Sequence, residues 1–154
     1  MEKPKFVYVT YIATTPEKLW EALTSGEFTR QFWWGRRVRA EWKPGGRLEM
    51  VQANGELDFS GEILACDPPR RLSYTFDVES LKFKNEDERP LRVTYEMTPV
   101  GGNVKLTVTH DELDPQGKVF GGISEGWPTL LSSLKSLLET GAALNYAGTE
   151  ADVE

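Results

Sequence analysis

The chain has 154 residues, enough for one domain with a substantial core, and its 39% hydrophobic and 27% charged residues are ordinary for a globular protein. The 24 acidic and 18 basic residues give a formal net charge of -6, which repels phosphate backbones and argues against nucleic acid binding. The one cysteine, Cys66, suits a reducing compartment, and no apolar run is long enough to span a membrane. We therefore expect a single cytoplasmic domain over residues 1–154, with a core at 5–141 and a frayed tail at 142–154.

The N-terminal part predicts one strand followed by two short helices. Phe6–Ile12 (FVYVTYI) is rich in β-branched and aromatic residues, which favour a strand. Thr15 is a favourable N-cap and Pro16 suits the first helical position, so the first helix is expected over residues 16–24. Residues 26–33 (GEFTRQFW) favour a second, shorter helix.

From Arg37 onward the hydrophobic residues alternate with polar ones, which is typical of strands. Glycine, proline and asparagine mark turns between the alternating runs. Cys66 is out of phase with Ile63 and Ala65, so it is expected away from the apolar face. The irregular stretch 77–90 is interpreted as a long, mobile hairpin loop. The alternation predicts six successive strands, centred on residues 38–42, 48–50, 57–65, 72–76, 91–97 and 104–110.

The last long element is an amphipathic helix that begins near Trp127 and ends at Gly141. Pro128 is expected in its first turn. An antiparallel meander with one apolar face needs a cover, and this helix provides one. Its apolar residues fall within an arc of about 120°: Trp127, Leu130, Leu131, Leu134, Leu137 and Leu138.

Several segments, in their order along the chain, resemble a known family: TPEKLWEALT, FWW, KPGGRLEM, DPPRRLSYTF and GWPTLLSSLKSLLETG. They are similar to the START-like (SRPBCC) superfamily, and more narrowly to single-domain proteins of the activator of Hsp90 ATPase homologue 1-like kind. The likeness covers residues 6–141. It implies an α+β helix-grip fold of the START-like or Bet v 1-like type, in which a curved antiparallel sheet of six to seven strands wraps around the long C-terminal helix. Two short helices follow the first strand.

The resemblance implies a cavity between the sheet and the last helix, where aromatic residues supply apolar walls and tyrosine, tryptophan and histidine add polar groups. The alternative is that these side chains fill a closed core. The leading hypothesis is non-enzymatic binding of a small hydrophobic or amphipathic, lipid-like molecule, without a cofactor. The expected ligand-binding residues are Phe32, Trp33, Trp34, Phe59, Tyr74, Phe76, Tyr95, His110, Trp127, Leu130, Leu131 and Leu134.

His110 is the one histidine of the chain, and its phase in the last strand directs it to the apolar face. It would act as a polar contact for a ligand or as a general base, or it would simply bond to backbone or to Asp111 or Glu112. A cyclase or hydrolase that pairs His110 with Asp111, Glu112 or Tyr95 is therefore an alternative. No catalytic residue is assigned. No metal site is expected, because no ligand spacing occurs.

A third hypothesis is an interaction protein of the chaperone or stress-response type, similar to activators of the Hsp90 ATPase, with a chaperone or a second copy as partner. It predicts an exposed apolar patch around Trp33, Trp34 and residues 77–90. Arginines near these tryptophans would hold a ligand anion or pair with surface carboxylates. The arginines are Arg30, Arg36, Arg37 and Arg39, and the candidate carboxylates are Glu41, Glu49 and Glu56.

Overall fold

The computed structural model describes residues 6–76, 91–111 and 118–144, and only the backbone of some of these, including Phe59, Phe76 and 118–126. The predicted loop at 77–90 lies outside the described residues. The described part contains seven strands and three helices: β1 (Phe6–Ile12), α1 (Pro16–Thr24), α2 (Gly26–Phe32), β2 (Arg37–Ala40), β3 (Arg47–Val51), β4 (Leu57–Asp67), β5 (Arg71–Phe76), β6 (Leu91–Val100), β7 (Asn103–Asp111) and α3 (Lys118–Thr140).

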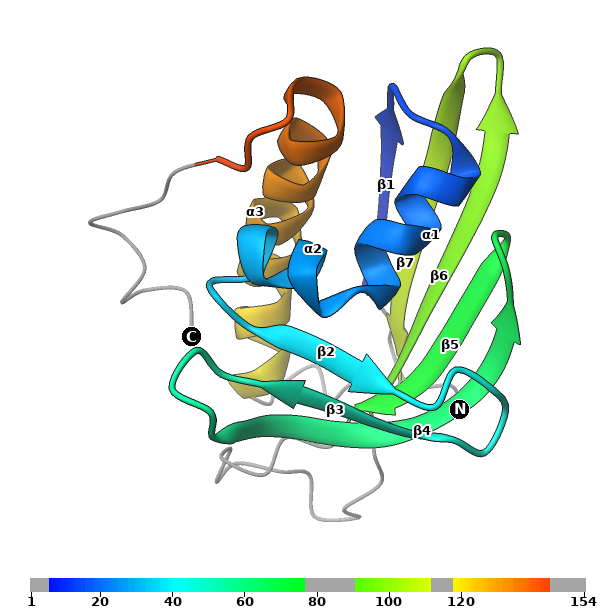
Figure 1. Cartoon of the computed structure of the whole chain (residues 1–154). Helices are drawn as coiled ribbons and strands as arrows, with labels where there is room; N and C mark the ends of the chain where they lie inside the picture. The colour runs from blue at the N-terminus through cyan, green and yellow to red at the C-terminus, as the bar shows by residue number, and fades with distance from the viewer. Residues whose placement is uncertain (1–5, 77–90, 112–117, 145–154) are drawn as a thin grey trace.

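The strands form one antiparallel sheet in the order β1-β7-β6-β5-β4-β3-β2. Strands β2 to β7 are a meander, and β1 returns to pair with β7 at one edge. Figure 1 shows the sheet curling so that β2, β3 and β4 run across the direction of β1, β7 and β6, with the three helices on one side of it. The inner residues of the strands and the helices form the core. The helix-grip α+β fold predicted from the sequence is confirmed.

Strand β4 joins the two parts of the curled sheet. Its first residues pair with β3 and its last residues with β5. Gly61 lies at this change of partner, and a Cβ atom there would come within 1.8 Å of the Thr75 carbonyl oxygen. Glycine therefore permits a close approach of β4 and β5 that any side chain would prevent. A bulge between Ile63 and Ala65 follows and adds to the bend.

The same bulge corrects the prediction for Cys66. An extra residue shifts the alternation of the strand, so Cys66 lies opposite the buried Leu72 and packs against the core. Its Sγ lies 3.5 Å from the Trp42 carbonyl oxygen. Burial, and secondarily the neighbouring Asp67, raise the pKa of the Cys66 thiol. The thiol is therefore protonated at neutral pH, and a weak nucleophile.

Helix α1 begins as predicted. The Thr15 side chain accepts a hydrogen bond from the Lys18 backbone N–H, and Pro16 occupies the first turn. The helix buries Leu19 and Leu23 and leaves Trp20 half-buried. The N-cap and the apolar spacing therefore fix both the start and the inner face of α1.

Helix α3 begins at Lys118, so the predicted start near Trp127 is wrong. Pro128 lies inside the helix, where it lacks the N–H that would bond to the carbonyl four residues earlier. The helix continues through this missing bond. The predicted end is right: Gly141 has φ +89° and donates its N–H to the Leu137 carbonyl. The stripe that α3 buries comprises Trp127, Leu130, Leu131, Leu134 and Leu137.

Strand β1 forms an edge of the sheet and contains no charged residue. Its outward-facing Val7, Val9 and Tyr11 are 51%, 43% and 52% exposed. Two side chains of α3 bind the end of this edge. The Lys135 ammonium donates to the Tyr11 carbonyl at 2.6 Å, and the Glu139 carboxylate accepts from the Ala13 N–H at 2.8 Å. We call this pair the Lys135–Glu139 clamp; it occupies backbone groups that an open edge would offer to another strand.

Candidate ligand-binding site

Trp127 of α3 is the centre of an aromatic cluster between helix and sheet. Its ring centroid lies 5.9 Å from that of Trp33 at the end of α2, 6.1 Å from that of Tyr95 on β6 and 6.1 Å from that of His110 on β7. The interplanar angles of 64° to 82° are edge-to-face arrangements, which aromatic rings favour. One side chain of α3 thus contacts three separate elements.

His110 is 1% exposed, and its phase toward the apolar face is confirmed. One partner of His110, Trp127, is not among the predicted ones. The Trp127 indole Nε1–H donates a 3.0 Å hydrogen bond to His110 Nδ1. A nitrogen that accepts a hydrogen bond carries no proton, so this contact assigns a neutral imidazole with its proton on Nε2. Nδ1 is therefore occupied by the indole. The side chain of Asp111, and Glu112 as a whole, lie outside what the structure describes.

Tyr74 and Tyr95, on neighbouring strands, share a buried hydrogen bond between their hydroxyl groups. The oxygens are 2.9 Å apart, and the ring centroids are 5.9 Å apart. Burial raises the pKa of both phenols, and for Tyr95 the neighbouring Tyr74 raises it further. Both groups are therefore neutral hydroxyls at any physiological pH and act as hydrogen-bond donors and acceptors.

Most of the side chains predicted to line a cavity lie together in this core. Trp34 is only half-buried, and the side chains of Phe59 and Phe76 are not described. In the described structure the buried members pack against one another and against α3, and their contact with a ligand stays a prediction. The buried members are Phe32, Trp33, Tyr74, Tyr95, His110, Trp127, Leu130, Leu131 and Leu134.

A tight turn after α2 directs Trp33 into the cluster. Trp34 has φ +48°, and Gly35 follows with φ +81°. A left-handed conformation strains a residue with a side chain by about 1–2 kcal/mol. Thr29, which was not predicted, connects α2 to β2: its buried hydroxyl donates to the Gly26 carbonyl and accepts from the Val38 N–H. Its position on the inner side of a short helix could have predicted this role, because a buried threonine hydroxyl commonly bonds to nearby backbone groups.

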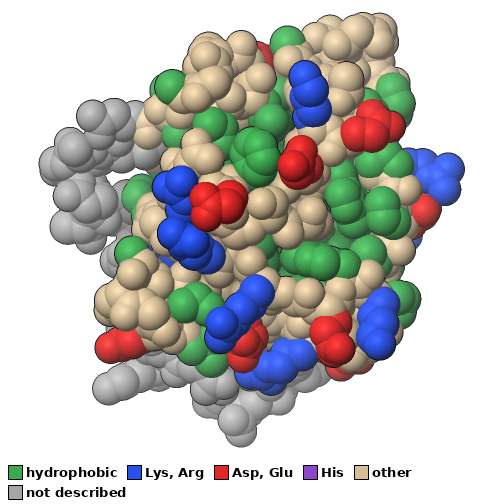
Figure 2. Space-filling view, in the orientation of Figure 1, with side chains coloured by type: hydrophobic (Ala, Val, Ile, Leu, Met, Phe, Trp, Pro, Cys, Tyr) green, Lys and Arg blue, Asp and Glu red, His purple; other side chains and the backbone are tan. Residues whose placement is uncertain are grey.

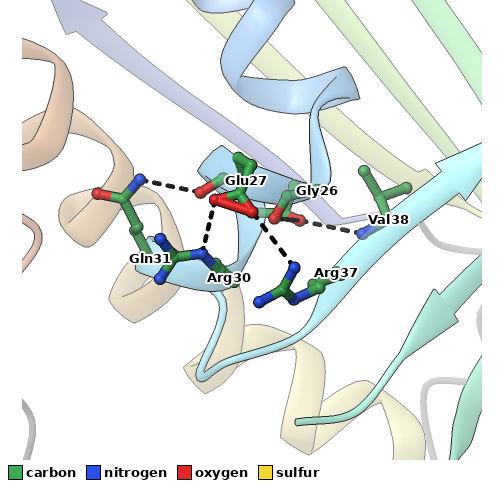
Figure 3. Close-up of polar contacts among 7 residues, drawn as sticks. Gly26, Glu27, Arg30, Gln31, Arg37 and Val38 are labelled. Carbon is green, nitrogen blue, oxygen red and sulfur yellow. Dashed lines mark hydrogen bonds and ion pairs between the residues drawn. The ribbon is translucent and has the colours of Figure 1, made fainter. Parts of the chain in front are cut away.

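Three of the four predicted arginines, Arg30, Arg37 and Arg39, lie on the outer surface and pair with glutamates. Glu27 binds Arg30 at 3.1 Å and Arg37 at 3.2 Å (Figure 3). Glu49, one of the predicted partners, binds two arginines of the sheet, Arg39 at 2.9 Å and Arg47 at 3.1 Å. Glu27 was not predicted.

On this face, acidic and basic side chains lie interspersed (Figure 2). The hydrogen bonds from Arg47 and then Arg39 lower the pKa of Glu49. The four paired arginines are 42% to 70% exposed, so these pairs are surface interactions rather than a buried anion site.

Within residues 6–76, 91–111 and 118–144, no group of three or more histidine, cysteine or acidic side chains is arranged to hold a metal ion. The helices of this part are all too short or too polar to cross a membrane.

The curled antiparallel sheet, the long helix across it and the aromatic cluster between them define a START-like helix-grip protein. A family model describes the chain more narrowly. The protein belongs to the activator of Hsp90 ATPase homolog 1-like family, whose model matches residues 13–139. No curated protein sequence matches the chain significantly.

Solved structures agree with this assignment. A protein from Mesorhizobium loti is 27% identical, with a TM-score of 0.73 over 88% of this chain and 96% of its own. The Aha1 dimer from Colwellia psychrerythraea is 18% identical, with a TM-score of 0.74 over 90% and 98%. An Hsp90 activator from Plasmodium falciparum is 21% identical, with a TM-score of 0.71 over 87% and 95%. The last two, below 25% identity, show the shared fold alone.

Proposed function

We propose that the protein binds a small apolar or amphipathic molecule between the sheet and α3, and that it does so without catalysing a reaction. The observation that carries this proposal is the set of polar groups inside the aromatic core: the paired hydroxyls of Tyr74 and Tyr95 beside the His110–Trp127 hydrogen bond. Small-molecule sites are mostly apolar and aromatic, with a few placed polar groups that orient the ligand. A core built for stability alone gains little from such groups, because replacing both partners of a buried hydrogen bond by apolar groups of the same shape is nearly neutral for stability.

The arrangement supports binding better than catalysis. A general base needs an accessible lone pair near the substrate, and the Nδ1 lone pair of His110 is engaged by Trp127. Both tyrosines are neutral and deeply buried. Apolar contact therefore supplies the affinity, and the hydroxyls supply the orientation.

The tryptophans provide the test. Their five indole N–H groups give separate NMR signals, and the two buried ones, Trp33 and Trp127, belong to the cluster, whereas Trp20 and Trp42 lie outside it. A panel of small aromatic and acyl compounds should shift the Trp127 and Trp33 signals and leave those of Trp20 and Trp42 unchanged. A panel in which nothing binds, or binding that moves only Trp20 and Trp42, would remove the proposal.

A second candidate function, interaction with a chaperone of the Hsp90 type, is supported by the family assignment. The predicted patch around Trp33 needs revision, since Trp33 is only 8% exposed. The exposed apolar side chains of β1 are a better candidate surface. A purified Hsp90 whose ATPase rate rises on addition of the wild-type protein, but not of a Val7→Asp/Val9→Asp variant, would support this role. An unchanged ATPase rate with wild-type protein would argue against it.

A second copy of the chain is another candidate partner, because the relative from Colwellia psychrerythraea is described as a dimer. Light scattering coupled to size-exclusion chromatography distinguishes a monomer from a dimer directly. A monomer at all accessible concentrations would exclude this assembly.

A further inference from the structure

The hydroxyl pair of Tyr74 and Tyr95 holds one more proton than its hydrogen bond uses. Each phenol carries one O–H donor, and a single hydrogen bond joins the two oxygens at 2.9 Å. One hydroxyl donates to the other, and the hydroxyl that accepts keeps its own proton for a further acceptor. The pair therefore has one hydroxyl proton that can be donated to an acceptor outside the pair.

The surroundings of the pair make this proton significant. Tyr74 is 3% and Tyr95 1% exposed. Among the described residues, neither hydroxyl has a hydrogen-bond partner other than the opposite tyrosine. A buried donor without an acceptor is destabilising, and proteins rarely keep one without a reason.

The neighbouring Trp127 and its partner His110 do not supply the acceptor. The ring of Trp127 packs edge-to-face on that of Tyr95 at 6.1 Å, but an indole has only a donor, and that donor is bound to His110 Nδ1. The lone pair of His110 is thus committed to Trp127. The acceptor has to come from outside these four side chains.

The charge of the core limits what that acceptor can be. The buried polar side chains of the described part are Thr29, Ser60, Ser73, His110 and Ser133, and none is a lysine or arginine. A carboxylate or phosphate would lose its hydration there without gaining a counter-charge from any described side chain of the core. The paired arginines do not change this, because they lie exposed on the outer surface. The acceptor is therefore a neutral one.

We propose that the Tyr74–Tyr95 pair binds a neutral carbonyl oxygen, such as that of a ketone, an aldehyde or an ester, on the apolar ligand. This inference rests on the proposed function and specifies its ligand class. The hydroxyl that donates within the pair polarises the second hydroxyl, which strengthens the bond to the carbonyl. The two tyrosines are positioning and specificity residues for binding.

The test uses acetophenone and cumene, two aromatic probes of nearly equal shape, of which only acetophenone has a carbonyl group. Dissociation constants are measured from the Trp127 indole signal for the wild-type protein and for Tyr74→Phe and Tyr95→Phe. The Tyr11→Phe variant is the control, because Tyr11 is 52% exposed on β1. The ratio of the two affinities removes effects of repacking that both probes share. The carbonyl stretching frequency of bound acetophenone reports the hydrogen bond directly.

We expect one of the two Phe variants to lower the affinity ratio of acetophenone to cumene by about fivefold to tenfold, as loss of one hydrogen bond implies. The other variant, which leaves a hydroxyl able to donate to the carbonyl, should keep most of the preference. Tyr11→Phe should leave the ratio unchanged. In the wild-type protein the carbonyl frequency should fall on binding, and it should return to its apolar value in the variant that loses the preference.

Three outcomes would overturn this inference. An equal ratio in the wild-type protein and both Phe variants would mean that the open proton is satisfied by buried water or by a protein acceptor, while the proposed function would stand. If the carbonyl stretching frequency of acetophenone did not fall on binding to the wild-type protein, the carbonyl would not be hydrogen-bonded to the pair, and the inference would be wrong in the same way. Failure of both probes to bind the wild-type protein would overturn the proposed function together with the inference.

Discussion

The two halves of the sheet use polar side chains in opposite ways. The site half, β5, β6, β7 and β1, directs Tyr74, Tyr95 and His110 inward against α3, where each is at most 3% exposed. The arginine half, β2 and β3 with the start of β4, directs Arg39, Arg47 and their shared Glu49 outward. Both halves follow the same alternation of apolar and polar residues.

The difference lies in what a polar contact contributes. An exposed ion pair competes with water and salt and contributes from about zero to 1 kcal/mol. A buried hydrogen bond has no such competitor, and breaking one leaves a group that water cannot reach, at a penalty of about 1–3 kcal/mol. Substitutions in the site half should therefore disturb the protein strongly, and those in the arginine half weakly.

The largest effect is expected for Trp127→Ala. It removes a side chain that is 6% exposed and contacts Trp33, Tyr95 and His110. We expect a loss of about 3–5 kcal/mol in the free energy of unfolding, as for other buried aromatic residues replaced by alanine. Urea denaturation followed by circular dichroism measures it.

Trp42→Ala is the matched control, because Trp42 is only half-buried and lies outside the cluster. It should cost clearly less than Trp127→Ala. Equal losses in the free energy of unfolding would mean that the aromatic cluster stabilises the fold no more than a half-buried tryptophan does. The proposed difference between the two halves of the sheet would then be wrong.

An intermediate effect is expected where the two halves join. In Gly61→Ala the new methyl group would overlap the Thr75 carbonyl, which lies 1.8 Å from the ideal Cβ position. Backbone has to move, at a cost of about 1–3 kcal/mol. Gly102→Ala, in the turn before β7 with nothing within 4 Å, should change stability by less than about 0.5 kcal/mol. If both variants were equally stable, β4 and β5 would not need their close approach.

The smallest effect is expected for Glu49→Gln in the arginine half. Its folded-state pKa is lowered by Arg47 and Arg39, so the carboxylate stabilises the fold above its unfolded pKa of about 4.3. This contribution is lost as the pH falls through the lower, folded pKa. Wild-type and variant should differ by less than about 1 kcal/mol at pH 7 and converge at acidic pH.

Salt should narrow the difference at pH 7, because these pairs are exposed. Glu21→Gln, on the exposed side of α1, is the control and should show no such convergence. A difference between wild-type and Glu49→Gln that persists in acid or in 1 M salt would show that Glu49 acts through packing rather than charge.

Local signals in the sequence predict most of the fold. Thr15 and Pro16 mark the start of α1, Gly141 marks the end of α3, and the alternation of the strands places His110 on the apolar face. These features depend on residues a few positions apart. The start of α3 was missed because proline favours the first turn of a helix, whereas Pro128 lies inside α3 with one backbone hydrogen bond unmade.

The contacts of the site depend on how distant elements dock. His110 bonds to Trp127 only because α3 packs on the inner side of the curled sheet, and Tyr74 meets Tyr95 through the register of β5 and β6. The side of the sheet on which Cys66 lies depends on the bulge between Ile63 and Ala65, which the residues of β4 do not predict. The sequence therefore predicts which residues belong to the site, but the hydrogen-bonded pairs that they form can be identified only from the three-dimensional structure.

The pairing of β1 with β7 has a consequence for the nascent chain during synthesis. Strand β1 is made before the other strands of this sheet and pairs with β7, which is made roughly a hundred residues later, and such non-local pairing slows folding. Until then FVYVTYI is an uncharged segment of strand-forming residues, the composition that promotes cross-β assembly. The Lys135–Glu139 clamp comes later still. A nascent chain stalled before residue 103 should therefore be far more prone to aggregate than the finished protein.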